Sequence, residues 1–154
     1  MISKIFLLGL LSITNSEIIA YNQDGENYMG IYMSGPCNKP MLANSVSVSV
    51  QPYQVSIGEQ ITINTEYYLD SQIDSGDYSY KATLSGFPVI SENGDLCEKL
   101  TGSQTPCPLK GWLKSNDNIT IASGTPKGKY IATANYSMKN GTTVVCIVYE
   151  FNVV

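Results

Sequence analysis

The chain has 154 residues, of which 43% are hydrophobic and 14% charged, with a formal net charge of -4 and a pI near 4.6. This length and composition fit one folded domain with a single hydrophobic core. All nine basic residues are lysines and there is no histidine, which excludes Ser-His-Asp and Cys-His catalysis, His-ligated zinc or haem, and bidentate binding of phosphate by arginine. The acidic balance argues against nucleic acid as a partner, because a duplex-binding protein needs a basic face.

The first segment has the pattern of a secretory signal peptide. A lysine precedes a short apolar run, 5–13, which ends in polar residues. A membrane-spanning helix needs about twenty apolar residues, so a membrane anchor is the weaker interpretation. We therefore assign residues 1–20 to a signal peptide, with cleavage after Ser16 or Ala20, and residues 21–154 to one domain in a secreted or endolysosomal protein.

Alternation of apolar and polar residues recurs along the rest of the chain, whereas helical periodicity is almost absent. It predicts a strand in each of the segments 45–50, 60–69, 77–86, 95–97, 118–122, 128–138 and 142–153. The pair Asn140-Gly141 predicts a type I′ turn between the last two strands. About seven antiparallel strands, each with one polar face, predict an all-β fold, an immunoglobulin-like two-sheet β-sandwich.

Four cysteines would be oxidised in pairs after secretion, and three pairings are possible. Cys97 and Cys107 bracket a short polar loop, while Cys37 and Cys146 lie near opposite ends of the domain. We favour these two pairs. A tetrathiolate zinc site is the alternative, but the spacing contains no CxxC motif.

Three N-glycosylation sequons begin at Asn118, Asn135 and Asn140. Such sequons fit a secreted glycoprotein, although they also arise by chance in chains rich in Asn and Thr. They predict a glycoprotein and give secretion weak support.

Several short motifs carry a family resemblance. In chain order they are Cys37, Pro52, Gly58, Ile61-x-Ile63, Gly76-x-Tyr78, Gly86-Phe-Pro-Val89, Leu96-Cys97, Cys107-Pro-Leu109, Gly128-Lys-Tyr130 and Cys146. Their order resembles the MD-2-related lipid-recognition (ML) family, which includes the Niemann-Pick type C2 sterol carriers and the fungal phosphatidylglycerol/phosphatidylinositol transfer proteins. The motifs in 95–100, 107–110 and 126–130 are most similar to the phospholipid-transfer branch. The resemblance implies a β-sandwich that holds a lipid tail between its sheets, with the same two disulfide pairs.

The inward residues of the predicted strands mix large rings with small side chains, as in Tyr80 beside Ala82, which leaves room for a cavity if the sheets splay. We predict that inward apolar residues, with an apolar run at the mouth, bind the lipid: Ile63, Tyr67, Tyr80, Leu84, Phe87, Val89, Ile90, Ala134, Ile147, Tyr149 and Phe151. A rim of Lys110, Trp112 and Lys114 is predicted to meet a headgroup or membrane surface, because an indole between ammonium groups suits that interface.

Together these patterns predict a lipid-binding protein that carries a phospholipid or sterol between membranes, without enzymatic chemistry, cofactor or metal. Its partners would be the lipid and, transiently, a membrane surface, and the protein would be a monomer. The alternative is a non-enzymatic extracellular binding or co-receptor module whose cavity is incidental or filled. Asp70, Asp74 and Asp77 surround a turn and are interpreted as solvated acids rather than a calcium site. The scattered carboxylates do not favour a two-carboxylate glycosidase.

Overall fold

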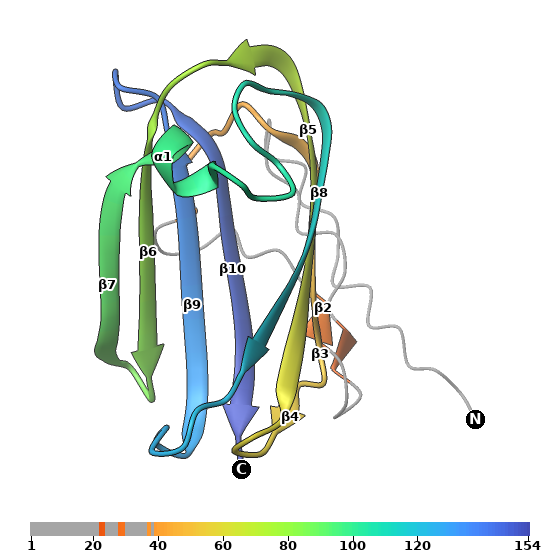
Figure 1. The fold of residues 1–154 in the computed structure, drawn as a ribbon, viewed down its shortest axis with the longest axis vertical. Helices are drawn as coiled ribbons and strands as arrows, with labels where there is room; N and C mark the ends of the chain where they lie inside the picture. The colour runs from red at the N-terminus through yellow and green to blue at the C-terminus, as the bar shows by residue number, and fades with distance from the viewer. Residues whose placement is uncertain (1–21, 24–27, 30–36, 38) are drawn as a thin grey trace, which may run out of the picture.

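The computed structural model describes residues 22–23, 28–29, 37 and 39–154. These residues form two five-stranded sheets that pack face to face, with a short helix at one end of the sandwich (Figure 1). The fold is therefore the predicted two-sheet β-sandwich. The predicted signal peptide, 1–20, lies outside the described residues. In the part of the chain that is described, no helix has the length and apolar character needed to cross a membrane.

The first sheet has the strand order β1-β2-β3-β5-β8 and is antiparallel throughout. Its strands are β1 (Asn22–Gln23), β2 (Tyr28–Met29), β3 (Asn44–Gln51), β5 (Gln60–Ile73) and β8 (Leu109–Thr120). Alternation along β5 buries Ile61, Ile63 and Tyr67 on one face, as the sequence pattern predicts. That face is turned toward the second sheet.

The second sheet has the order β4-β10-β9-β6-β7, in which β4 runs parallel to β10 and the other pairs are antiparallel. Its strands are β4 (Gln54–Val55), β6 (Asp77–Leu84), β7 (Phe87–Asp95), β9 (Gly128–Ser137) and β10 (Thr143–Val153). The helix α1 (Leu96–Leu100) follows β7 directly. The outer strands β7 and β8 are thus edges of the two sheets.

Three expected elements differ from the structure. The segment near 95–97 is not a strand but the start of α1, because the Asp95 carboxylate accepts the backbone N–H of Glu98 at 3.0 Å and caps a helical turn. Residues 118–120 are the end of the long strand β8, which begins already at Leu109. The apolar run 87–90, which lies outside the predicted strands, begins the strand β7, which is exposed and therefore shows no alternation.

The turn between β9 and β10 is also not the expected type I′ turn. The N–H of Gly141 donates to the Met138 carbonyl at 2.9 Å, and the Met138 N–H donates to the Thr142 carbonyl at 2.8 Å. A type I′ turn needs positive φ at both central residues, but only Gly141 has it, at +89°. The Asn140 side chain instead accepts the N–H of Thr142 at 3.0 Å. The result is a three-residue loop that ends in a left-handed glycine.

Both expected disulfides are present, Cys37–Cys146 and Cys97–Cys107. The first ties the segment before β3 to β10, and the second ties α1 to the loop that precedes β8. The loop between Cys97 and Cys107 is therefore held against the end of the sandwich where α1 lies.

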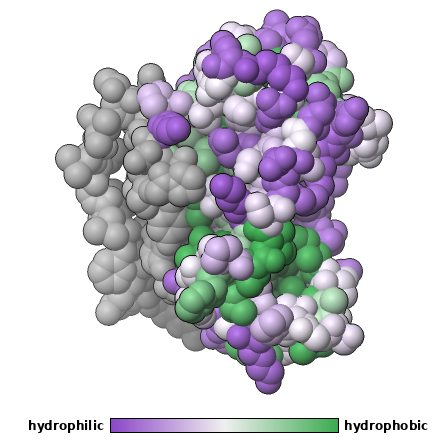
Figure 2. Space-filling view, turned by 90° about the vertical axis from the view of Figure 1, so that its left-hand side faces the viewer, coloured by the Kyte–Doolittle hydropathy of each residue, from purple (hydrophilic) through white to green (hydrophobic). Residues whose placement is uncertain are grey.

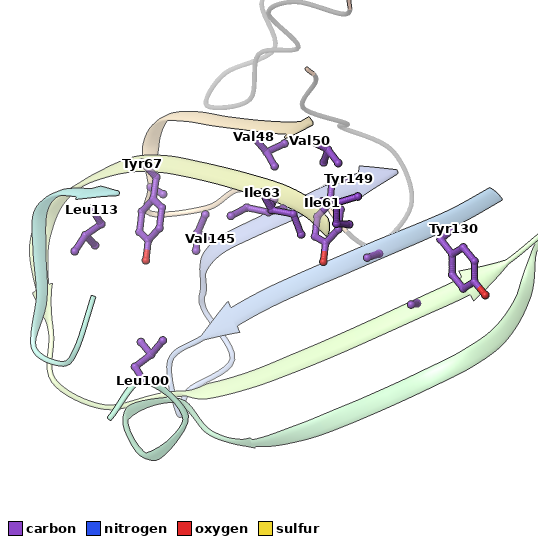
Figure 3. Close-up of a cluster of buried hydrophobic side chains, with 14 of the residues drawn as sticks. Val48, Val50, Ile61, Ile63, Tyr67, Leu100, Leu113, Tyr130, Val145 and Tyr149 are labelled. Carbon is purple, nitrogen blue, oxygen red and sulfur yellow. The ribbon is translucent and has the colours of Figure 1, made fainter. Parts of the chain in front are cut away.

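The core occupies the side of the sandwich where β10 packs opposite β3. Figure 3 shows side chains of β3 and β5 gathered opposite Val145 and Tyr149 of β10. Val48, Val50 and Ile61 in this group are almost completely buried. Toward the free edges β8 and β7, the side chains no longer fill the space between the sheets.

Candidate functional site

A cavity of about 390 Å³ lies between the two sheets, within the range of about 300–1,000 Å³ typical of small-molecule sites. Its wall is largely apolar and is formed by residues of β5, β8, β6, β9 and β10, with contributions from β7, α1 and the disulfide loop. The lining residues are Ile63, Thr65, Tyr67, Tyr78, Ser79, Tyr80, Glu92, Lys99, Thr105, Leu113, Ser115, Asp117, Ile119, Ala134, Tyr136, Ile147 and Tyr149.

The mouth of the cavity lies along the second half of β8. On the inward face of this strand, Leu113 is only 8% exposed, whereas Ile119 is 38% exposed and Asp117 is also exposed. On the other sheet, Glu92 of β7 pairs in register with Tyr80, so both face inward. The polar lining residues Glu92 and Asp117 therefore lie at the open side together with Ile119, while the buried Ile63, Leu113 and Ile147 lie deeper.

Phenol groups gather inside the cavity. The hydroxyls of Tyr80 and Tyr149 are 2.9 Å apart and hydrogen-bonded. Tyr67 reaches from β5 into the space between the sheets (Figure 3), and its buried hydroxyl has no hydrogen-bond partner among the described residues. Burial raises the pKa of Tyr67, Tyr80, Tyr136 and Tyr149, so these groups are neutral at physiological pH.

Three charged side chains line the mouth. The Lys99 ammonium lies 3.3 Å from a Glu92 carboxylate oxygen and 5.1 Å from the centre of the Tyr78 ring. Asp117 projects from the inward face of β8. After burial, its charge is a further cause of the raised pKa of Tyr136. The mouth thus combines one internal ion pair with a separate carboxylate.

The structure brings together six of the eleven residues predicted to bind lipid. They are Ile63, Tyr67, Tyr80, Ala134, Ile147 and Tyr149. Two others pack elsewhere: Leu84 lies against the core, and the Phe151 ring stacks on Tyr130 with 5.2 Å between centroids.

The remaining three, Phe87, Val89 and Ile90, form an exposed group on β7 that we call the apolar lip. Phe87 is 73% exposed, and Figure 2 shows an apolar patch in the lower half of the face on which β7 lies. Ile90 pairs in register with Ala82, and Phe87 pairs with Leu84. Since Ala82 and Leu84 continue the inward face of β6 beyond Tyr80, the apolar lip extends the inner surface of the sandwich to its open edge.

The predicted rim does not line the cavity. Lys110, Trp112 and Lys114 alternate with the inward residues of β8 and so lie on its outer face. Trp112 is 56% exposed and packs on Tyr68 with 5.3 Å between ring centroids. Lys114 pairs with Glu66 at 3.5 Å. The cation that lies at the mouth is Lys99, which sequence reasoning missed because it placed a strand where α1 begins.

The three sequons lie at different places on the sandwich. Asn118 is on the outer face of β8, where its side-chain oxygen accepts the Thr62 hydroxyl at 2.8 Å. Asn135 is half-buried within β9, and Asn140 is exposed in the hairpin loop. Their glycosylation remains a prediction.

The described part of the chain offers no candidate metal site. Among the described residues, no group of three or more His, Cys, Asp or Glu side chains could hold a metal ion. Of the three acids near the turn after β5, Asp77 instead pairs with Lys139 at 2.6 Å.

The model of the ML domain family matches residues 35–153, and the chain belongs to this family. It is 30% identical over 102 residues to a phosphatidylglycerol/phosphatidylinositol transfer protein of Yarrowia lipolytica, covering 65% of this chain and 54% of that protein. A protein of the same name in Candida albicans is 27% identical, with 88% of this chain and 72% of the relative covered. The chain thus spans about half the length of the Yarrowia relative.

Solved structures share the fold. A Niemann-Pick type C2 protein from the Japanese carpenter ant superposes with a TM-score of 0.51 at 11% identity, covering 66% of this chain and 79% of that one. The C-terminal domain of wzt superposes with a TM-score of 0.55, also at 11% identity, covering 87% and 80%. At this identity the likeness concerns the β-sandwich alone.

Proposed function

We propose that this protein binds a lipid in the cavity between its sheets and carries it between membranes. The observation that carries the proposal is the largely apolar cavity, with Ile63, Leu113 and Ile147 in its deeper wall and polar groups at its mouth. An amphiphile fits such a site with its hydrocarbon inside and its headgroup at the mouth. The names of the relatives, and the place of the chain in the ML family, support the same function.

The mechanism is noncovalent burial and release. Each buried CH₂ group contributes about 0.8 kcal/mol relative to water, so a long acyl chain gains on the order of ten kcal/mol in the cavity. It loses a similar amount on leaving a bilayer. The exchange is therefore nearly balanced, as a carrier requires, and needs no cofactor or reaction.

The apolar lip supports a transient contact with a membrane. Phe87, Val89 and Ile90 are exposed on the edge strand β7, next to the mouth side of the cavity. Burial of such a group in the interface of a bilayer would bring the mouth close to the lipid that is exchanged. The two disulfides fit an oxidising compartment, so we place the protein outside the cell or in the endolysosomal lumen. We also propose that it acts as a monomer.

Transfer of a fluorescent phospholipid or sterol between donor and acceptor vesicles tests the proposal. The secreted protein is expected to accelerate transfer in proportion to its concentration. A folded protein that neither binds nor transfers either lipid would favour the alternative, a co-receptor or adhesion module with an incidental cavity.

A further inference from the structure

One hydroxyl group in the wall of the cavity has no partner. Tyr67 lines the cavity and is only 5% exposed, and its hydroxyl is buried without a hydrogen bond among the described residues. Its ring points from β5 into the space between the sheets (Figure 3). A buried hydroxyl without a partner costs free energy, and few native structures keep one. The Tyr67 hydroxyl is therefore a candidate for a hydrogen bond to a bound ligand.

Tyr67 belongs to a group of four phenols that together can donate more hydrogen bonds than they form. Tyr80 and Tyr149 share one hydrogen bond at 2.9 Å, which uses one of their two hydroxyl protons. Burial raises the pKa of Tyr67, Tyr80, Tyr136 and Tyr149, and Tyr136 adds to this effect at both Tyr67 and Tyr149. The four groups keep their protons at physiological pH. This part of the cavity thus offers donors to a ligand group that only accepts.

The phenols lie between the charged mouth and the apolar core. The Lys99 ammonium at the mouth lies 5.1 Å from the centre of the Tyr78 ring. Tyr78 pairs in register with Tyr136 on β9, and Tyr136 pairs with the almost completely buried Val145 on β10. Neighbouring strands are about 4.8 Å apart. Polarity therefore falls from an ammonium group, through phenols, to apolar side chains over a few strand spacings.

A diacyl glycerophospholipid carries its groups in the same order. The charged headgroup is followed by two ester groups on the glycerol and then by the acyl chains. Ester carbonyls accept hydrogen bonds and donate none. With the headgroup at the mouth and the acyl chains against the apolar wall, the esters lie at the level of the phenols. A sterol has a single hydroxyl and no carbonyl, so it does not match this order.

We infer that the Tyr67 hydroxyl donates a hydrogen bond to an ester carbonyl of the bound lipid, so that the cavity selects ester-linked glycerophospholipids. The inference rests on the proposed function, which puts the headgroup at the mouth, and it names the ligand class. It also explains why the chain keeps a hydroxyl that destabilises the free protein, because the ligand supplies the missing partner.

Competition between an ester lipid and an ether lipid tests this inference. Vesicles containing equal amounts of diacyl phosphatidylglycerol and its dialkyl ether analogue are incubated with the protein, and the extracted lipids are quantified by mass spectrometry. Both lipids carry the same headgroup and chains of equal length, but only the diacyl lipid has ester carbonyls. The ratio of diacyl to dialkyl lipid is expected to be about fivefold higher for the wild type than for Tyr67→Phe, which corresponds to about 1 kcal/mol, the usual net value of one hydrogen bond.

Comparison of the variants isolates the hydroxyl. The two lipids can differ in how easily they leave the bilayer, but this difference is the same for every variant and cancels when the ratios are compared. Tyr68→Phe removes the hydroxyl of the adjacent residue, which packs on the exposed Trp112 on the outer face, and should leave the wild-type ratio unchanged. Circular dichroism verifies that both variants are folded.

Other outcomes overturn the inference. The same ratio for the wild type and Tyr67→Phe contradicts it and leaves the proposed function standing, provided that lipid is extracted. An equal loss of both lipids in Tyr67→Phe would assign the hydroxyl to the phosphate that the two lipids share. An equal change of ratio in Tyr68→Phe would show that the effect does not come from the cavity. Extraction of neither lipid by the folded wild type contradicts the proposed function itself, and the inference with it.

Discussion

The hydroxyl oxygens of Tyr80 and Tyr149 lie 2.9 Å apart, although β9 separates their strands. The residues of β9 that pair in register with them are both alanines: Ala134 pairs with Tyr80 and Ala132 with Tyr149. The small side chains leave room for the two rings to meet above β9. The hydrogen bond between them satisfies two hydroxyl groups that the cavity would otherwise leave without a partner.

Removal of one of these hydroxyls should destabilise the fold. Tyr80→Phe leaves the buried Tyr149 hydroxyl without its partner, which costs about 1–2 kcal/mol. Tyr149→Phe should cost a similar amount, and the double variant should cost less than the sum of the two. Urea unfolding of the two single variants and the double variant measures this coupling. Strictly additive losses would contradict an interaction between the two hydroxyls.

Removal of the Tyr67 hydroxyl should instead stabilise the fold, because this hydroxyl is buried without a partner among the described residues. Tyr67→Phe removes an uncompensated polar group and should raise the free energy of unfolding by about 1–3 kcal/mol. The adjacent Tyr68→Phe is the control, because Tyr68 belongs to the outer face and packs on the exposed Trp112. Lower stability of Tyr67→Phe would mean that its hydroxyl has a partner.

A larger side chain at Ala134 should block the cavity. Ala134 lines the cavity on β9, so Ala134→Phe would occupy space needed by the ligand and lower lipid affinity by about tenfold or more, since each tenfold corresponds to 1.4 kcal/mol. Thr133→Phe, on the opposite face of the same strand, should retain binding. Displacement of a fluorescent lipid measures both affinities. Unfolding curves of both variants must accompany the binding measurement, because overpacking by itself lowers the free energy of unfolding by about 1–3 kcal/mol.

Acid should weaken the fold through Asp95. Its carboxylate accepts the backbone N–H of Glu98 and an ammonium hydrogen of Lys139, and the first of these interactions is the main reason that the pKa of Asp95 lies below its ordinary value. A group with a depressed folded pKa stabilises the protein above its unfolded pKa, about 3.9, and loses this contribution as pH falls through the folded pKa.

Stability should therefore decline as pH falls below about 4, and it should decline less steeply in Asp95→Asn. Chemical unfolding curves between pH 6 and pH 2.5 compare the two proteins. An identical decline in the variant would show that other carboxylates determine acid sensitivity.

The sequence predicts the sandwich well where one face of a strand is buried. Ile61, Ile63 and Tyr67 alternate with polar residues because the core accepts only one face of β5. This alternation of apolar and polar residues is lost on the free-edge strands β7 and β8. On β8, Ser115 and Asp117 occupy inward positions at the mouth, where no core selects apolar side chains, so the alternation fades. On β7, every residue from Phe87 to Gly94 is exposed and only its pairing with β6 reveals the strand.

The candidate site could be predicted only in part, because its mouth is formed by edge strands that show no alternation. Inward residues of alternating strands, such as Tyr80 and Ile147, follow from the pattern, whereas the groups at the mouth depend on how the edges are arranged in space. The helix that carries Lys99 did leave a local signal, because Asp95 with Glu98 three residues later is typical of a helix N-terminus. Its contact with Glu92 requires the three-dimensional structure.

Native mass spectrometry of the purified protein tests the central claim most directly. The account predicts that the wild type, purified without added lipid, retains one lipid molecule, and that the folded Ala134→Phe variant carries much less of it. A wild type that appears only at the mass of the polypeptide with any attached glycans, and that takes up no lipid when incubated with vesicles, would contradict the account.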